Sequence, residues 1–256
     1  MAESSVLQLW RWPVKSMGGE RLRSIRVDAR GAGGDRTHAV LHEHKGDWKP
    51  LTAREAPRLL AWSAAYPFAR DAGLRPEDPP HAQVTAPDGR HSWRWDDPRL
   101  RQALEEDLGR PLRLRRDVGG IQDLERSLLL TFEATYAALD AELDQPLDLR
   151  RFRPNLHIGS DAPAWAEEGW GGGRVRFSGG VVLRLLHPCV RCAIPTRSPD
   201  TQEKWPGLLR HLAAHHGTLF GINARVLQAG RIAAHETLEL LPPNQAAPRG
   251  VQPAGP

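Results

Sequence analysis

Glycine and proline recur so often along this chain that we expect few long helices or strands. The sequence holds 24 glycines and 22 prolines, and short apolar or alternating runs stand between them. Two such runs, Gln83 to Thr85 and His91 to Trp95, flank the turn signal Pro87-Asp88-Gly89-Arg90 and predict a hairpin. The pattern therefore predicts a β-rich α+β fold with many turns.

Helical patterns are confined to a few short segments. They cover residues 98–108, 132–143 and 205–216, and Gly109 is a plausible stop for the first of them. That first helix closes a β-rich first half. Residues 242–256 are rich in Pro, Gly, Ala and Gln, which predicts a disordered tail.

The net charge and the cysteine content of the chain limit the kinds of function that we expect. The net charge of +4 comes from arginines dispersed along 256 residues, which disfavours nucleic acid and favours a small anionic ligand held by a few guanidinium groups. The sequence has two cysteines, no apolar run behind a basic N-terminal segment and no long uninterrupted apolar stretch. We therefore expect a soluble cytoplasmic protein that acts on a small molecule, without membrane or nucleic-acid binding.

The two cysteines, Cys189 and Cys192, stand three residues apart in a stretch that also contains Arg191. The apolar run 181–186 predicts a buried strand that delivers them to a proline-bounded loop. The positive charge of Arg191 favours the thiolate, which is the form that attacks electrophiles and ligates metals. The stretch is therefore a candidate reactive or metal-binding site.

Several functions compete for this cysteine pair. A thioredoxin-type motif normally opens a helix, which Pro195 and the β-branched neighbours disfavour here. A zinc knuckle needs a second ligand pair, and no other cysteine exists. One thiolate that binds a soft metal centre is the functional interpretation that remains. The alternative is that the cysteines are simply small buried apolar residues.

Separate positions carry groups suited to an anion. Lys15 and Ser16 lie in a loop closed by two glycines, which fits an ordinary solvated turn equally well. Arg36 follows a glycine-rich turn, where a surface charge pair with Asp35 is the equal alternative. Thr131 stands between an apolar run and a helical pattern, so we expect it to be the N-cap. A helix that starts there can bind an anion, although this motif alone favours a threonine that merely caps.

The densest basic cluster is Arg150-Arg151-Phe152-Arg153-Pro154-Asn155. Its three arginines repel one another, so their folding together needs compensating negative charge. We expect this charge from Glu167 and Glu168 or, equally, from a bound phosphate.

A pair of histidines, His211 and His215, is spaced by one helical turn, which can suit a metal ion. No third ligand is evident, and Leu212 stands where a general-base glutamate would follow His211. Metal binding is therefore the less favoured interpretation of this pair.

Taken together, five motifs resemble the MOSC superfamily, in the branch that contains the mitochondrial amidoxime-reducing component and its bacterial relatives. The motifs are Pro13-Val14-Lys15-Ser16, Asp35-Arg36, Arg151-Phe152-Arg153-Pro154-Asn155, Pro188-Cys189-Val190-Arg191-Cys192 and Phe220-Gly221. The resemblance implies an N-terminal MOSC β-barrel-like domain over residues 1–118, packed on a MOSC β-barrel domain with a few helices over residues 119–241.

The resemblance also implies a molybdenum cofactor, or molybdopterin, between the two domains. Cys192 would ligate the molybdenum, with Cys189 as the alternative ligand. The remaining implied cofactor-binding residues are Lys15, Ser16, Arg36, Thr131, Arg151, Arg153, Asn155 and Arg191.

The function implied by the resemblance is the reduction of N-hydroxylated compounds, with electrons from a separate reductase or ferredoxin. A chain with two cysteines cannot hold a fused iron–sulfur cluster of its own. A sulfur carrier or cofactor carrier that uses Cys192 is an alternative, and a relative without cofactor is a third. The superfamily is also associated with pyridoxal phosphate binding.

Overall fold

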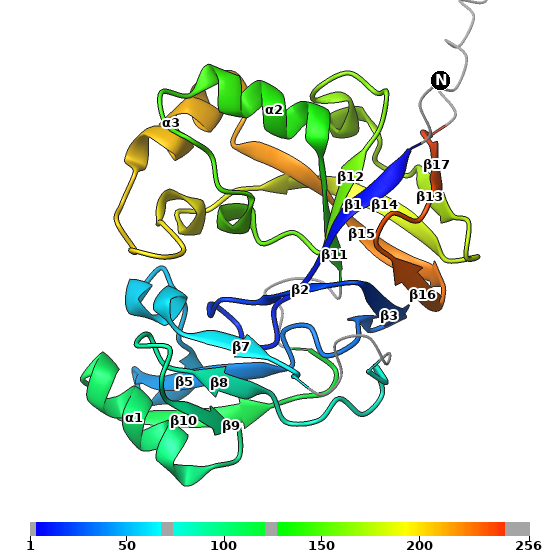
Figure 1. Ribbon diagram of the computed structural model, residues 1–256. Coiled ribbons are helices and arrows are strands. Elements are labelled where there is room, and N and C mark those ends of the chain that lie inside the picture. Colours follow the sequence, from blue (N-terminus) through cyan, green and yellow to red (C-terminus); the bar gives the residue numbers. More distant parts are fainter. Residues whose placement is uncertain (1–3, 68–73, 121–126, 244–256) are drawn as a thin grey trace, which may run out of the picture.

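The structure is a computed structural model that describes residues 4–67, 74–120 and 127–243. Strands dominate this part of the chain and three α-helices accompany them, which confirms the predicted β-rich α+β class (Figure 1). No helix in the described ranges is long and apolar enough to cross a bilayer. Of the predicted disordered tail, residues 244–256 lie outside the described part of the chain.

An eight-stranded sheet forms the upper part of Figure 1. Neighbouring strands pair antiparallel except β11 and β12, which pair parallel. In spatial order its strands are β17 (Leu238–Leu241), β13 (Arg174–Phe177), β14 (Val182–Val190), β15 (Leu219–Gln228), β11 (Leu128–Phe132), β12 (Leu156–Gly159), β1 (Ser5–Arg11) and β2 (Glu20–Leu22). The sheet is therefore built mostly from the second half of the chain, with two N-terminal strands at one edge.

Three small sheets of three strands complete the strand layout of the described residues. The predicted hairpin is confirmed, because β8 and β9 pair antiparallel with Val84 opposite Trp93. The three sheets are β10 (Leu112–Arg116), β5 (His38–His44) and β6 (Asp47–Pro50); β16 (Gly230–Ala233), β3 (Ser24–Asp28) and β4 (Gly31–Ala32); and β7 (Ser63–Ala65), β8 (Gln83–Thr85) and β9 (Ser92–Arg94).

The two halves of the chain exchange strands. β1 and β2 join the large sheet, and β16 crosses in the other direction to pair with β3. The domain ranges 1–118 and 119–241 therefore stay a prediction.

The first α-helix forms as its end signals predict. α1 (Pro98–Leu108) starts after Asp97, whose carboxylate accepts a hydrogen bond from the backbone N–H of Arg99, and ends at Gly109 in the left-handed conformation. Leu100 and Leu104 are fully buried in the core of the N-terminal half. The helix thus closes that core, as expected from the sequence.

The other two helices cover a separate apolar cluster. α2 (Glu133–Glu142) contributes Leu139, and α3 (Pro206–His215) contributes Leu208 and Leu212. The cluster also contains Phe152, from the short 3₁₀ helix η2 (Leu149–Phe152), and Phe220, whose rings stack with centroids 3.8 Å apart. This packing fixes η2, the element that precedes Arg153.

The remaining 3₁₀ helices are η1 (Pro57–Ala61), η3 (Ala166–Gly169) and η4 (Ile194–Thr196).

The expected N-cap at Thr131 is wrong. Pairing of β11 with β12 continues to Phe132, which takes the N-cap position and makes no side-chain cap bond. Thr131 instead lies fully buried within the strand, with its hydroxyl 3.0 Å from Nδ1 of His157. Since the strand runs one residue further than predicted, the threonine side chain cannot reach the helix N-terminus.

Gly221 lets β15 approach β11 closely. Its φ is +75°, and a Cβ built there would lie 2.5 Å from the carbonyl oxygen of Leu130. An L side chain is strained at this φ and also clashes with sheet backbone that cannot move without loss of strand pairing. Only glycine fits this position.

Replacing Gly221 by alanine is therefore expected to lower the free energy of unfolding by at least about 2 kcal/mol. Gly217→Ala is the matched control, because φ is +56° there but the nearest atom, in the Leu219 side chain, is 3.9 Å away. The control should lose only about 1 kcal/mol from backbone strain. Denaturant unfolding followed by circular dichroism measures both values, and equal losses would contradict the steric explanation.

Candidate functional site

A pocket of about 340 Å³ is lined by both halves of the chain. It brings together eight of the ten predicted site residues: Lys15, Ser16, Arg36, Arg153, Asn155, Cys189, Arg191 and Cys192. Its other lining residues are Thr52, Ser127, Leu129, Phe152, His187, Val190, Ile194 and Asn223. This described lining holds four lysine or arginine side chains and no carboxylate, so it suits an anionic ligand.

The cysteine segment differs from the predicted loop. β14 continues through Pro188 to Val190, so Cys189 lies within the strand and Cys192 lies just beyond it. The pairing register of β14 with β15 shifts on both sides of Pro188, and such irregularity is how a strand tolerates a proline. Cys189 is half-buried, whereas Cys192 is exposed.

Arg191 joins the cysteine segment to η2. Its Nη1 donates to Sγ of Cys189 over 3.1 Å, and its Nη2 donates to the carbonyl oxygen of Phe152 over 2.8 Å. Its buried Nε has no hydrogen-bond partner in the described part of the chain. The guanidinium group therefore orients the Cys189 side chain and keeps a donor for another acceptor.

Arg36 and Arg153 connect the two walls of the pocket. Arg36 pairs with the buried carboxylate of Asp35, and its Nη2 donates to the carbonyl oxygen of Arg153 over 3.1 Å. Arg153 connects the same two walls from the other side, since its Nη1 donates to the carbonyl oxygen of Met17 over 2.6 Å. The guanidinium of Arg153 also lies 4.3 Å from the ring centroid of Trp12.

The positive charge of Arg153 is poorly compensated. Burial, together with the positive charges of Arg36 and Arg191, lowers the pKa of Arg153 to about 9, although Asp35 acts in the opposite direction. Its buried Nη2 has no hydrogen-bond partner among the residues described. An anion in the pocket would supply both the missing acceptor and the missing charge.

Three pocket residues hold a left-handed backbone: Ser16 at φ +68°, Arg36 at +49° and Arg153 at +55°. Non-glycine residues rarely adopt this conformation, and it persists where neighbouring contacts fix it. The backbone N–H of Arg36 donates to the carbonyl oxygen of Trp12 over 2.7 Å, and Oγ of Ser16 accepts from the backbone N–H of Ala53 over 3.0 Å. These contacts aim the three side chains into one pocket.

Asn155 lines the pocket, but its amide is already engaged. Its Oδ1 accepts from the backbone N–H of Leu129 over 3.1 Å, and its Nδ2 donates to the carbonyl oxygen of Trp10 over 3.4 Å. The side chain thereby ties β11 and β1 together. Its observed role is to position the strands that form the pocket floor.

Thr131 and Arg151 do not line the pocket. Arg151 instead donates from Nη1 to the carbonyl oxygen of Pro195 over 3.1 Å and lies near the ring of Trp205. It therefore holds the segment that follows Cys192 rather than facing the pocket.

The carboxylates expected for the arginine cluster are wrong. Glu167 is buried and accepts from the Thr135 hydroxyl over 2.8 Å, and neither it nor Glu168 forms an ion pair with Arg150, Arg151 or Arg153 in the described part of the chain. Asp148 and Asp200 take its place, and each forms a 2.6 Å ion pair with Arg150. Only Arg150 is neutralised in this way, which leaves the positive charge at Arg153 for the pocket.

Four polar lining residues escaped the sequence reasoning: Thr52, Ser127, His187 and Asn223. His187 and Asn223 stand within or beside the quoted cysteine and Phe220-Gly221 motifs, so closer attention to motif neighbours would have found them. No sequence signal marks Thr52, which reaches the pocket through chain folding alone.

Inorganic pyrophosphate is expected to bind the ligand-free protein in this pocket. At about ten times the dissociation constant it should stabilise the fold by about 1.4 kcal/mol, or about 3 to 5 °C in melting temperature. Arg153→Gln should abolish most of this shift, whereas Arg58→Gln, an exposed arginine paired with Asp107, should keep it. Equal shifts for both variants, or a shift reproduced by sodium chloride of equal ionic strength, would contradict a built anion site.

Several known proteins are similar to this chain. The human protein "Mitochondrial amidoxime-reducing component 1" is 28% identical over 243 residues, which cover 77% of this chain and 67% of the human protein. The Xenopus laevis protein of the same name is 33% identical over 86 residues, 34% of this chain and 24% of that protein. The solved YuaD protein from Bacillus subtilis matches 94% of this chain and 97% of its own, at 13% identity and a TM-score of 0.47, which adds nothing to the assignment.

Family models account for nearly the whole described chain. The model of the MOSC N-terminal beta barrel domain matches residues 3–97, and the model of the MOSC domain matches residues 104–239, more than half of the sequence. Both matched regions contribute side chains to the pocket. The chain therefore belongs to the MOSC domain family, with a MOSC N-terminal beta barrel domain ahead of its MOSC domain.

Proposed function

We propose that this protein binds a molybdenum cofactor in the pocket and reduces N-hydroxylated compounds with electrons from a separate donor. The observation that carries the proposal is the pocket lining, which combines two cysteines with four cationic side chains and no described carboxylate. Similarity to proteins named amidoxime-reducing components supports the substrate class.

The residues fit an anionic cofactor. Nη2 of Arg153 and Nε of Arg191 are buried donors without a partner in the described chain, and a buried unsatisfied donor is unfavourable by about 1–3 kcal/mol. A phosphate group offers the acceptor oxygens that guanidinium groups bind best. Lys15, Ser16 and Arg36 line the same pocket from the N-terminal half, so we assign them, with Arg153, to holding the cofactor's anionic part.

Cys192 is our proposed molybdenum ligand. The sulfur of Cys189 already accepts a hydrogen bond from Arg191, whereas Cys192 is the exposed cysteine at the pocket. When bound, the molybdenum centre would supply the two-electron redox chemistry that removes oxygen from an N–O bond. Cys189 remains the alternative ligand.

Other predicted residues act indirectly in this proposal. Asn155 links β11 to β1 across the start of β12, and Arg151 donates to the carbonyl oxygen of Pro195. Thr131 bonds His157 inside the sheet. We assign these three to positioning the pocket walls rather than to contact with the cofactor.

Substrate and electrons would approach from the exposed side of the cysteine segment. Val190, which lines the pocket, keeps 68% of its surface exposed. We assign the electrons to a separate donor, since a ferredoxin-type iron–sulfur cluster uses four cysteine ligands and this sequence has two cysteines.

A sulfur carrier is the second candidate. An exposed cysteine at the edge of a cationic pocket also suits a persulfide, and the exposure of Cys192 favours this role. A sulfur carrier would bear labile sulfur on Cys192 and would not turn over N-hydroxylated compounds.

The reductase function predicts turnover of a hydroxylamine or amidoxime by the cofactor-loaded protein with an artificial electron donor. Cys192→Ala should lower kcat by at least about 100-fold through loss of a metal ligand. Cys189→Ala should retain most of the activity and is the matched control. Molybdenum-loaded protein that never turns over these substrates, but carries persulfide on Cys192, would contradict the reductase and support the carrier.

A further inference from the structure

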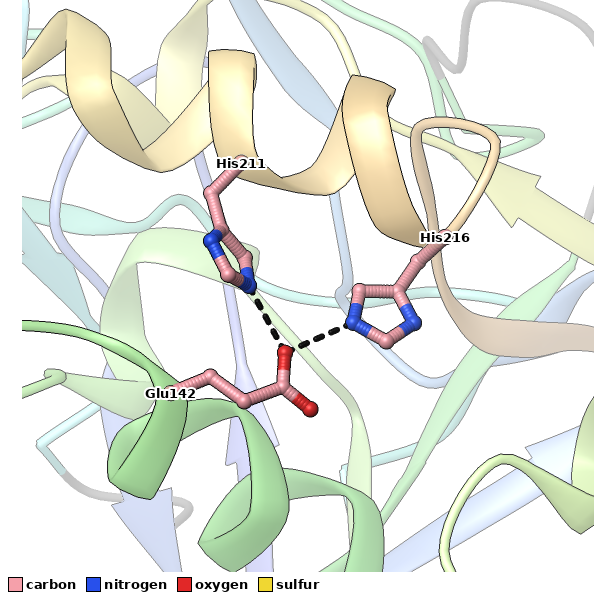
Figure 2. A group of neighbouring side chains, drawn as sticks. All are labelled: Glu142, His211 and His216. Atoms are coloured by element: carbon pink, nitrogen blue, oxygen red, sulfur yellow. Dashed lines mark hydrogen bonds and ion pairs between the residues drawn. The ribbon is translucent and has the colours of Figure 1, made fainter.

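A second group of potential ligands lies on the helical side of the molecule. Glu142 is the last residue of α2, His211 lies in α3, and His216 follows the last residue of α3. Nε2 of each histidine is 2.7 Å from the same Glu142 Oε2, and Figure 2 shows both rings directed at that carboxylate. One ligand atom from each of the three residues lies within 4.8 Å of the others.

We propose that Glu142, His211 and His216 bind one Zn²⁺ ion. Two imidazole nitrogens and a carboxylate oxygen are ligands that zinc prefers, and a three-residue set leaves a fourth tetrahedral position for water. The inference is independent of the molybdenum proposal, because none of the three residues lines the cationic pocket.

The charge around the group favours a cation. α2 ends at Glu142 and α3 ends at His215, so the carboxyl ends of both helices meet here. A helix carries partial negative charge at that end, in addition to the carboxylate itself. The site therefore provides negative potential for a divalent ion without further acidic residues.

Stacking contacts hold the ligands in place. The ring of His216 stacks on Trp165 with centroids 3.6 Å apart, and the ring of His211 stacks on His215 at 4.4 Å. The side chains of His216 and His211 keep 13% and 20% of their surface exposed, and Glu142 keeps 34%. The ligands are thus ordered in advance and still accessible to an ion from solvent.

The histidine pair considered from the sequence is the wrong pair. Nδ1 of His215 is 3.0 Å from the backbone carbonyl oxygen of His211, so its ring is turned to its own helix. The second ligand is His216, and the third, Glu142, lies 69 residues before His211 in the chain. No helical spacing rule connects Glu142 with the two histidines, so sequence reasoning alone could not identify it as a third ligand.

A bound zinc ion would fasten α2 to α3. Both helices cover the apolar cluster that contains Phe152, and Phe152 also lines the pocket. Without metal the two histidines can hold the carboxylate by hydrogen bonds alone, which is the competing explanation of the geometry. Direct titration with Zn²⁺ distinguishes a metal site from a group held by hydrogen bonds alone.

The test uses the full chain with Cys189 and Cys192 replaced by serine, so that thiols cannot bind the ion. Calorimetric titration with Zn²⁺ should saturate at one ion per chain and raise the melting temperature. Glu142→Gln, His211→Ala and His216→Ala should each weaken binding at least about tenfold. His215→Ala is the matched control and should weaken binding much less than His216→Ala, because the His215 ring stacks on His211 but supplies no ligand.

Spectroscopy of Co²⁺-loaded parent protein tests the site without relying on any ligand variant. A tetrahedral d–d spectrum, with X-ray absorption that reports two imidazole ligands, is the expected result. No stoichiometric Zn²⁺ binding, an octahedral Co²⁺ spectrum, or a His215→Ala variant that loses as much affinity as His216→Ala would overturn the proposal.

Discussion

Positive charge gathered where the two halves of the chain meet is the constraint on which the site depends. Arg36 donates to the backbone of Arg153, and Arg153 donates to the backbone of Met17, so the same groups that carry the charge also hold the pocket walls together. The positive charges of the pocket repel one another, and the described pocket lining contains no carboxylate that balances them. The fold therefore keeps a cationic pocket at some expense in stability, and a bound anion would relieve it.

Strand exchange is what keeps this arrangement rigid. β1 joins the large sheet and β16 pairs with β3, so the loop with Lys15 and Ser16 starts from an N-terminal strand that is anchored in the sheet of the second half. Asn155 adds side-chain bonds between β1 and β11. Three pocket residues can hold left-handed backbone because these contacts fix their surroundings. The pocket is thus positioned by sheet pairing rather than by a flexible hinge.

Local signals in the sequence were sufficient for elements that depend on local physics. Turn residues predicted the β8–β9 hairpin, and Gly109 predicted the end of α1. The resemblance to a known family grouped residues that lie far apart in the chain. Eight of the ten site residues predicted in this way do line the same pocket. The errors concern features that depend on tertiary contacts. Strand pairing that continues to Phe132 buries Thr131, and an irregular pairing register allows Pro188 to lie within β14. Glu167 bonds to Thr135 instead of an arginine. Neither periodicity nor propensity contains that information.

Molybdenum content tests directly whether the cationic pocket binds the cofactor. Protein purified from a host that makes the cofactor should contain one molybdenum per chain by elemental analysis. Cys192→Ala should lose the metal, while Cys189→Ala, which changes the cysteine bonded to Arg191, should keep it. Wild-type protein without molybdenum would contradict a cofactor-binding pocket, and loss of metal only in Cys189→Ala would move the ligand to the other cysteine.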